Sequence, residues 1–228
     1  MKMLAIDTST ASCSVALLEN RQLQFECIYT AGNTHSRHLM EMIDQTLAAC
    51  RFRLTDLDGF AVTSGPGTFT GLRIGISTVK GLAVATCKPV VGVSSLAALT
   101  HPLSNWDGPV IPMIDARRGE VYWTVFKKGS NEFEPSEAVS VCAPETAMRT
   151  IAPGSLLVGS GAQLYRDLFK DCCPQIHVAD DPLHVIRAAS VGLLALERFR
   201  RNDTDPVNGL IPDYIRKSDA QIQKAVNC

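Results

Sequence analysis

The feature that most constrains the fold is an order of elements that occurs twice along the chain. Each half opens with an apolar strand that ends in aspartate, at residues 3–7 (MLAID) and 110–115 (VIPMID). Two more strand-like segments follow in each half, and such short runs separated by turn residues are typical of hairpins. Helical spacing then alternates with short apolar strands. The sequence therefore predicts two α/β lobes of similar topology with a cleft between them.

The predicted elements of the first lobe follow the order strand, strand, strand, helix, strand, helix, strand. They are strands at 3–7, 13–18 and 22–29, a helix at 35–50, a strand at 59–63, a helix at 72–86, a strand at 89–93 and a short helical stretch from Ser94. A turn-rich linker at 102–109 separates this unit from the next.

The second half repeats that order with little sequence identity. We predict strands at 110–115, 120–127 and 138–142, a helix at 144–151, a strand at 156–158, a helix at 163–170, a strand at 176–178 and a long helix at 184–200. The predicted division is a first lobe at 1–101, a second lobe at 109–218 and a flexible tail at 219–228.

Composition excludes several classes of protein. The chain has 22 Lys and Arg against 23 Asp and Glu, so its net charge of −1 provides no field that attracts bare RNA or DNA. No run of 18 uncharged apolar residues exists, and Asp7 interrupts the N-terminus before a signal peptide could develop. The eight cysteines form no C-x-x-C pair and indicate small buried residues of a reducing compartment. We therefore expect a cytoplasmic protein without a membrane segment.

Asp7 and Asp115 are the strongest candidates for a site, because each ends an apolar strand at the predicted cleft. Two such turns could present backbone N–H groups and carboxylates to a metal-bound polyphosphate. An aspartate after a strand also often makes only a local turn. Both interpretations stay open.

The glycine-rich segment 63–76 (TSGPGTFTGLRIGI) contains no Walker A sequence, since no Gly-Lys-Ser/Thr follows the glycines. Its glycines favour a tight strand-to-helix turn that serves packing, and contact with an anion is the alternative. The helix that follows has a second face of apolar or small residues, among them Ile74, Ser77, Gly81 and Val84. A second such face indicates a covering neighbour, either in the chain or in a partner.

Several segments together resemble the TsaB family, also called YeaZ, of the actin and sugar-kinase superfamily. They are IDTST at 6–10, HSRHLMEMID at 35–44, the glycine-rich segment, MIDARRGEVYW at 113–123, GSGA at 159–162 and PDYIRKS at 212–218. The resemblance implies two ribonuclease-H-like βββαβα(βα) lobes of the actin-like ATPase type. It also implies a subunit of the bacterial machinery that installs threonylcarbamoyl on the adenosine beside the anticodon of tRNAs.

The catalytic relative, TsaD, carries a metal-binding H-x-x-x-H where this chain has Ser95 and Leu99. Two ligands at i and i+4 are needed to hold a metal on one helical face, so we predict no metal site, no catalytic residue and no cofactor of its own. Weak binding of ATP or ADP stays open at a degenerate nucleotide-like cleft. Its predicted residues are Asp7, Thr8, Ser9, Asp115, Arg117, Gly159 and Gly161.

The resemblance implies partners. TsaD is expected to dock on the first-lobe helices, TsaE to join a ternary complex, tRNA to be reached only through the partner, and a homodimer to form when TsaD is absent. The predicted interface residues are His35, Arg37, His38, Leu39, Met42, Arg73, Ile74, Ser77 and Gly81. His35 and His38 have no recognisable third metal ligand nearby. The alternative function is an ATP-dependent phosphotransferase that uses Asp7 and Asp115 with magnesium; a metallopeptidase lacks its motifs.

Overall fold

Each predicted hairpin-led unit forms one mixed sheet in the computed structural model, which describes residues 1–30, 35–129 and 133–215. The first sheet has the order β3 (Gln22–Tyr29), β2 (Cys13–Glu19), β1 (Lys2–Asp7), β4 (Gly59–Gly65) and β5 (Val90–Ser94). The three hairpin strands are antiparallel, whereas β4 and β5 run parallel to β1. The pairings of β1 with β2 and of β2 with β3 are the hairpins that the sequence predicts.

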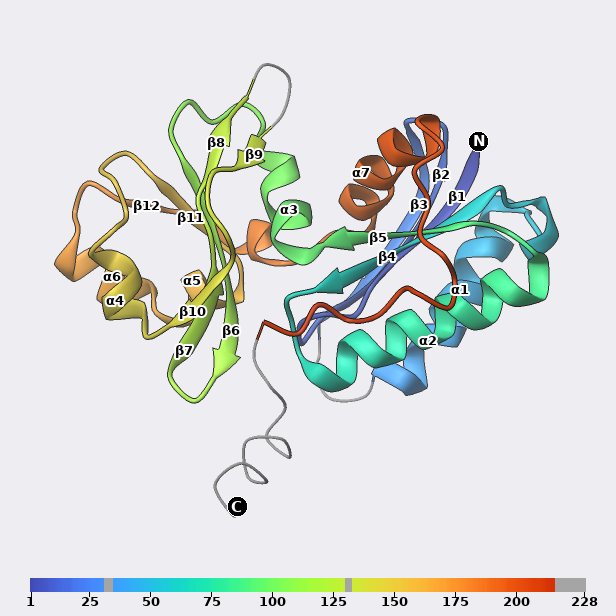
Figure 1. The fold of residues 1–228 in the computed structure, drawn as a ribbon, viewed down its shortest axis with the longest axis horizontal. Helices are drawn as coiled ribbons and strands as arrows, with labels where there is room; N and C mark the ends of the chain where they lie inside the picture. Colours follow the sequence, from blue (N-terminus) through green and yellow to red (C-terminus); the bar gives the residue numbers. More distant parts are fainter. Residues whose placement is uncertain (31–34, 130–132, 216–228) are drawn as a thin grey trace, which may run out of the picture.

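The second sheet repeats the arrangement. Its main path is β10 (Ser140–Cys142), β7 (Glu120–Trp123), β6 (Val110–Arg117), β11 (Leu156–Val158) and β12 (His177–Val178). Two short strands, β8 (Phe126–Lys128) and β9 (Phe133–Pro135), attach beside β6. Figure 1 shows the two lobes side by side. The predicted fold class is confirmed.

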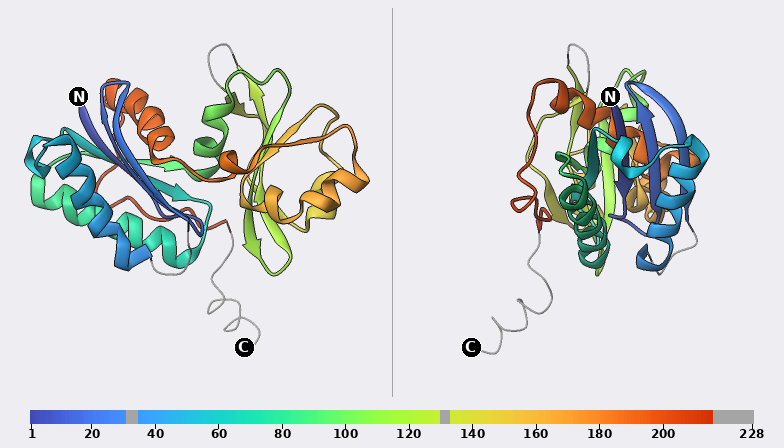
Figure 2. Two further views of the ribbon diagram at one scale, coloured as in Figure 1. Left: turned by 180° about the vertical axis from the view of Figure 1, so that it is seen from behind. Right: turned by 90° about the vertical axis from the view of Figure 1, so that its right-hand side faces the viewer.

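Three helices cover the first sheet. α1 (His35–Cys50) and α2 (Phe69–Thr86) lie on one face, and α7 (Ala188–Arg200) lies on the other (Figures 1 and 2). The 3₁₀ turn η1 (Leu54–Asp56) follows α1. Apolar residues at helical spacing on α1 and α2 supply the core on their side of the sheet.

The remaining helical elements belong to the lobe junction and the second lobe. α3 (Ser95–Thr100) and η2 (His101–Leu103) lead into β6 at the junction. The others are α4 (Pro144–Met148), α5 (Ser160–Leu164), α6 (Arg166–Cys172) and η3 (Asp181–His184). In the described part of the chain, no helix has the length and apolar character needed to cross a membrane.

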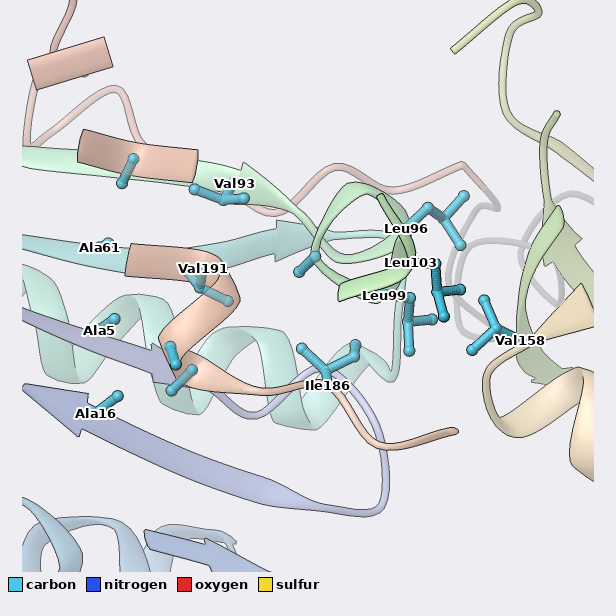
Figure 3. Packing of buried hydrophobic residues seen from close by; sticks show 14 of the residues in the cluster. Ala5, Ala16, Ala61, Val93, Leu96, Leu99, Leu103, Val158, Ile186 and Val191 are labelled. Carbon is cyan, nitrogen blue, oxygen red and sulfur yellow. The ribbon is translucent and has the colours of Figure 1, made fainter. Parts of the chain in front are cut away.

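The predicted domain division needs a correction at its C-terminal end. Residues 184–200 are predicted to belong to the second lobe, but α7 crosses back and packs on β1, β2, β4 and β5. The reason is steric fit. A Cβ built on Gly192 would lie 2.4 Å from Leu18 Cδ1 and 3.2 Å from Ala5 Cβ, so the helix rests directly on the small residues of the sheet (Figure 3).

The segment after α7 also belongs to the first lobe. Asp205 pairs with Val90 at the edge of β5, and the side chain of Leu210 is buried in the first-lobe core. Lys80 of α2 donates a hydrogen bond to the carbonyl of Asn208 at 3.3 Å. We call residues 203–214 the C-terminal strap. The predicted tail at 219–228 lies outside the described residues.

Local differences from the predicted elements occur mainly in the second lobe. The strand expected at 120–127 is interrupted, because Val125 O accepts from Ser136 N (2.8 Å) and Thr124 Oγ1 donates to Glu137 O (2.8 Å). The helix expected at 163–170 is two short helices, α5 and α6. The helix expected from residue 184 begins only at Ala188.

One apolar cluster runs through both lobes. Leu96, Leu99 and Leu103 of the first lobe belong to the same cluster as Ile186 and as Val158 of the second lobe, and Figure 3 shows the three leucines between Ile186 and Val158. The two lobes are therefore joined by packed side chains as well as by the chain connections.

Candidate functional site

Asp7, at the end of β1, is turned into the protein. Its side chain is fully buried, and its Oδ1 accepts hydrogen bonds from Ser9 N (3.0 Å), Ser9 Oγ (2.6 Å) and Thr63 Oγ1 (2.7 Å). Ser9 N–H is therefore engaged by the carboxylate and is not directed toward a phosphate. The arrangement is an aspartate turn that also ties β1 to β4.

The glycine-rich segment packs directly on this turn. A Cβ on Gly67 would lie 2.3 Å from Ser9 O, and one on Gly71 would lie 2.0 Å from Thr8 O. Thr68 N–H donates to Ser9 O at 2.7 Å, and Thr8 Oγ1 donates to Gly71 O at 2.7 Å. These contacts support the packing interpretation, because only glycine permits so close an approach of two backbones.

The matching turn of the second lobe is more exposed. Asp115 Oδ1 accepts from Arg117 N at 2.8 Å, and the Arg117 guanidinium lies 3.4 Å from Asp115 Oδ2. The Arg117 side chain is 72% exposed, so this ion pair is a solvated surface contact. Arg117 and Asp115 thus engage each other locally.

Gly159 and Gly161 are held by packing against β6 and β7. Gly159 has a φ of +103°, and a Cβ there would lie 2.3 Å from Met113 O. A Cβ on Gly161 would lie 2.9 Å from Val121 Cγ1. The structure thus gives each of these glycines a steric role.

His184 is a buried site residue that the sequence analysis missed. Its Nδ1 accepts the Gly159 N–H at 3.0 Å, and its Nε2 lies 3.1 Å from Arg166 Nη2. Burial is the largest cause that lowers the pKa of His184, and the charge of Arg166 lowers it further. A lone histidine before a helix carries no sequence signal for such a contact.

A pocket of about 260 Å³ opens near the lobe junction, and none of the predicted cleft residues lines it. Its lining residues are Arg21, Ala97, Thr100, His101, Ser104, Phe133 and Leu194.

Ser95 and Leu99 are both buried on α3, at 0% and 2% exposure. Leu99 is part of the cluster that joins the lobes. Among the described residues, no group of three or more His, Cys, Asp or Glu side chains is placed to hold a metal ion. Burial raises the pKa of the Cys13 thiol to about 12, which makes it an unreactive core residue.

The predicted partner face on α1 needs a correction. Leu39 and Met42 are only 1% and 6% exposed and belong to the first-lobe core. Arg37 is exposed, and the half-buried His38 ring lies 4.6 Å from the Tyr29 ring. The side chain of His35 lies outside the described part of the structure.

The predicted face on α2 is accessible. Arg73, Ser77 and Gly81 are exposed, and Ile74 is half-buried. In the described part of the chain, no atom would lie within 4 Å of a Cβ on Gly81. The opposite side of α2 is buried, with Leu72, Ile76, Val79 and Ala83 in contact with the core. We call the exposed stripe Ser77, Gly81, Val84 and Ala85, which continues from Arg73 along the helix, the α2 face.

Solved structures with similar folds include two from Pseudomonas aeruginosa. A protein described as similar to peptidase YeaZ has a TM-score of 0.79 at 30% identity, covering 94% of this chain and 99% of that one. A second, described as YeaZ, has a TM-score of 0.77 at 29% identity, with the same coverage. An ADPNP-bound dehydratase activator from Clostridium difficile has a TM-score of 0.54 at 9% identity and covers 89% of this chain and 97% of that one, so it shows only a shared fold.

Comparisons of the sequence identify the same group of proteins as the solved structures do. The family model for TsaD, tRNA N6-adenosine threonylcarbamoyltransferase, matches residues 29–224. The TsaB proteins of Escherichia coli and Bacillus subtilis, named as tRNA threonylcarbamoyladenosine biosynthesis proteins, are 32% and 29% identical. The first match covers 96% of both chains, and the second covers 97% of this chain and 96% of its relative. The chain therefore belongs to the TsaB (YeaZ) family, within the wider family that the TsaD model describes.

Proposed function

We propose that this chain is a non-catalytic partner subunit in the biosynthesis of threonylcarbamoyladenosine in tRNA. It acts in the cytoplasm, binds TsaD through its first lobe, enables TsaE to engage, and so permits modification of the adenosine next to the anticodon in tRNAs that read ANN codons. The names of the TsaB relatives support the pathway.

The observation that carries the non-catalytic part is the burial of Ser95 and Leu99. These are the positions at which the resemblance to TsaD requires imidazoles. Neither side chain is a strong metal ligand, and Leu99 packs across the lobe junction. The turn at Asp7 adds support, since Oδ1 of its carboxylate accepts hydrogen bonds from three internal donors. A subunit of this kind binds the catalytic protein through its surface and does not itself carry out the reaction.

The α2 face is the surface that this proposal assigns to TsaD, or to a second copy of the chain when TsaD is absent. Its small residues allow a partner helix to approach closely, in particular at Gly81. Val84 is 65% exposed and lies beside the exposed Ala85, so this face offers apolar surface that a partner could cover. The face excludes Leu39 and Met42, because their burial makes them unavailable.

The test is complex formation with TsaD from the same organism, measured by size-exclusion chromatography with light scattering. Gly81→Glu adds charge and bulk at an open position, and a residue other than glycine favours the helix, so the fold is not weakened. We expect it to weaken the heterodimer at least tenfold. Thr146→Arg, at an exposed position of α4 in the second lobe, is the control. An unchanged complex in Gly81→Glu and Ser77→Arg would remove the interface assignment.

Calorimetry separates the proposal from the phosphotransferase alternative. The purified chain is titrated with ATP and magnesium, and ADP is assayed afterwards. Weak binding without turnover is compatible with a partner subunit, whereas tight binding with phosphoryl transfer would favour the enzyme.

A further inference from the structure

The first turn of α2 carries a cluster of two aromatic rings and a guanidinium. The Phe69 and Tyr214 rings are stacked with centroids 5.1 Å apart. Arg73 Cζ lies 3.7 Å from the Phe69 centroid and 5.8 Å from the Tyr214 centroid, and Arg73 Nε donates to Tyr214 Oη at 2.8 Å. Two of the three residues belong to α2 and the third to the C-terminal strap, which runs beside the helix in Figure 1.

The cluster is ordered by the folded chain yet open to solvent. Tyr214 follows Asp213, whose N–H donates to Ser64 O at 2.7 Å, and the strap is anchored by the buried Leu210. Phe69 and Tyr214 nevertheless remain 39% and 41% exposed. A ligand that stacks here does not have to order these side chains first, which reduces the entropic cost of binding.

The charge of the cluster favours an anionic ligand. In the part of the chain that the structure describes, no carboxylate lies within salt-bridge distance of Arg73. The first turn of α2 has no acidic residue, so the positive end of the helix dipole is not compensated there. An apolar helix that covered this position would desolvate an uncompensated guanidinium. A nucleotide offers both an aromatic plane and a phosphate.

We propose that Phe69, Arg73 and Tyr214 form a stacking platform for one unpaired base of an RNA loop, with Arg73 also contacting an adjacent phosphate. Unpaired bases stack on aromatic rings and on guanidinium planes, and this is the usual mode of single-strand recognition. The inference goes beyond the proposed function, in which tRNA is reached only through the partner. The stacking platform includes neither Ser77 nor Gly81, the residues of the α2 face whose substitution tests the TsaD interface.

The test uses the full chain and two fluorescently labelled seven-nucleotide RNAs, one of adenosines and one abasic with the same phosphates. Anisotropy is measured at low salt. The adenosine RNA is expected to bind more tightly, and Phe69→Ala or Tyr214→Leu to weaken its binding by roughly 5- to 150-fold. The abasic RNA should be little affected. The slope of log K against log salt should be near −0.7, as for about one phosphate contact.

Arg73→Lys separates stacking from charge. Lysine keeps the positive charge but has no planar group, so affinity for the adenosine RNA should fall while affinity for the abasic RNA is retained. Arg149→Ala, an exposed arginine of the second lobe, is the control for net charge. Urea unfolding midpoints establish that each variant is folded, and photocrosslinking with 4-thiouridine RNA should label the peptides that contain Phe69 or Tyr214.

Three results would overturn the platform. They are equal affinity for the two RNAs, unchanged binding in Phe69→Ala, and no RNA binding by the chain either alone or in complex with TsaD. A heterodimer that is lost in Phe69→Ala while RNA binding persists would make the cluster a protein contact instead. Loss of the heterodimer in Gly81→Glu with base stacking intact would support the platform. Failure of Gly81→Glu to weaken the heterodimer would count against the proposed interface alone.

Discussion

Leu99 of α3 packs against the backbone of Gly159 in the second lobe, so closely that a Cβ on Gly159 would lie 2.8 Å from Leu99 Cδ1. Truncation of this leucine removes contacts to both lobes. We expect Leu99→Ala to lower the free energy of unfolding by about 2–5 kcal/mol in urea titrations. Leu164→Ala, at a 59% exposed leucine, should change it by less than about 0.5 kcal/mol. A small effect at Leu99 would show that the junction is not tightly packed.

Gly159→Ala tests whether this turn serves packing. Alanine at a φ of +103° and a ψ of 174° is strained by about 1–3 kcal/mol, and its Cβ would also collide with Met113 O. Gly154→Ala is the matched control, because Gly154 also has positive φ but no described atom lies within 4 Å of its Cβ. The thermal midpoint should therefore fall further for Gly159→Ala than for Gly154→Ala. Equal shifts would contradict the steric account.

Asp7→Ala is expected to destabilise the fold. Removal of the carboxylate leaves the Ser9 N–H and the hydroxyls of Ser9 and Thr63 without their acceptor, and each unsatisfied buried group costs about 1–3 kcal/mol. Urea unfolding should show a loss of about 3 kcal/mol or more. Asp115→Ala, which removes a surface contact, should cost less than about 1 kcal/mol. If Asp7→Ala unfolds like the wild type and loses only nucleotide binding, Asp7 is a ligand residue.

The stability of the chain should decrease in mild acid because of His184. Its pKa is lowered in the folded state, mainly by burial, so the unfolded chain binds the proton more readily. The contribution of neutral His184 to the stability of the fold is fully present above the pKa of about 6.5 that histidine has in the unfolded chain. It is lost as the pH falls from 6.5 toward the lower pKa of His184 in the folded chain. Urea titrations at pH 7.5, 6.5 and 5.5 should show this decline. His184→Gln should be less stable at pH 7.5 and show a shallower dependence on pH.

Local sequence signals predict the order of elements well, because hairpins and helical spacing are short-range properties. The two strands predicted to end in aspartate, β1 and β6, each lie in the middle of a sheet, although β6 continues to Arg117. The elements α1, β3 and β11 have the bounds that the sequence predicts. The same signals do not fix which face of α1 is buried. Leu39 and Met42 fit the helical spacing, yet both point into the core, because the sheet occupies that side.

Contacts between distant segments account for the remaining differences. Nothing in residues 188–200 indicates that they pack on residues 2–19, since the fit depends on small side chains on both surfaces. The partnership of Gly159 with His184 and the stacking of Phe69 on Tyr214 join positions that are far apart in the sequence. A resemblance to a family can indicate such residues, but one chain read alone does not pair them.

The position of α7 has a consequence for biosynthesis. The helix that covers one face of the N-terminal sheet is translated only after the whole of the second lobe. Until α7 emerges, the nascent polypeptide exposes the face formed by Ala5, Ala16 and Leu18 to solvent. Folding of the first lobe must therefore wait for the synthesis of residues 188–200, and a chain truncated before Ala188 would be a client for chaperones rather than a stable fragment.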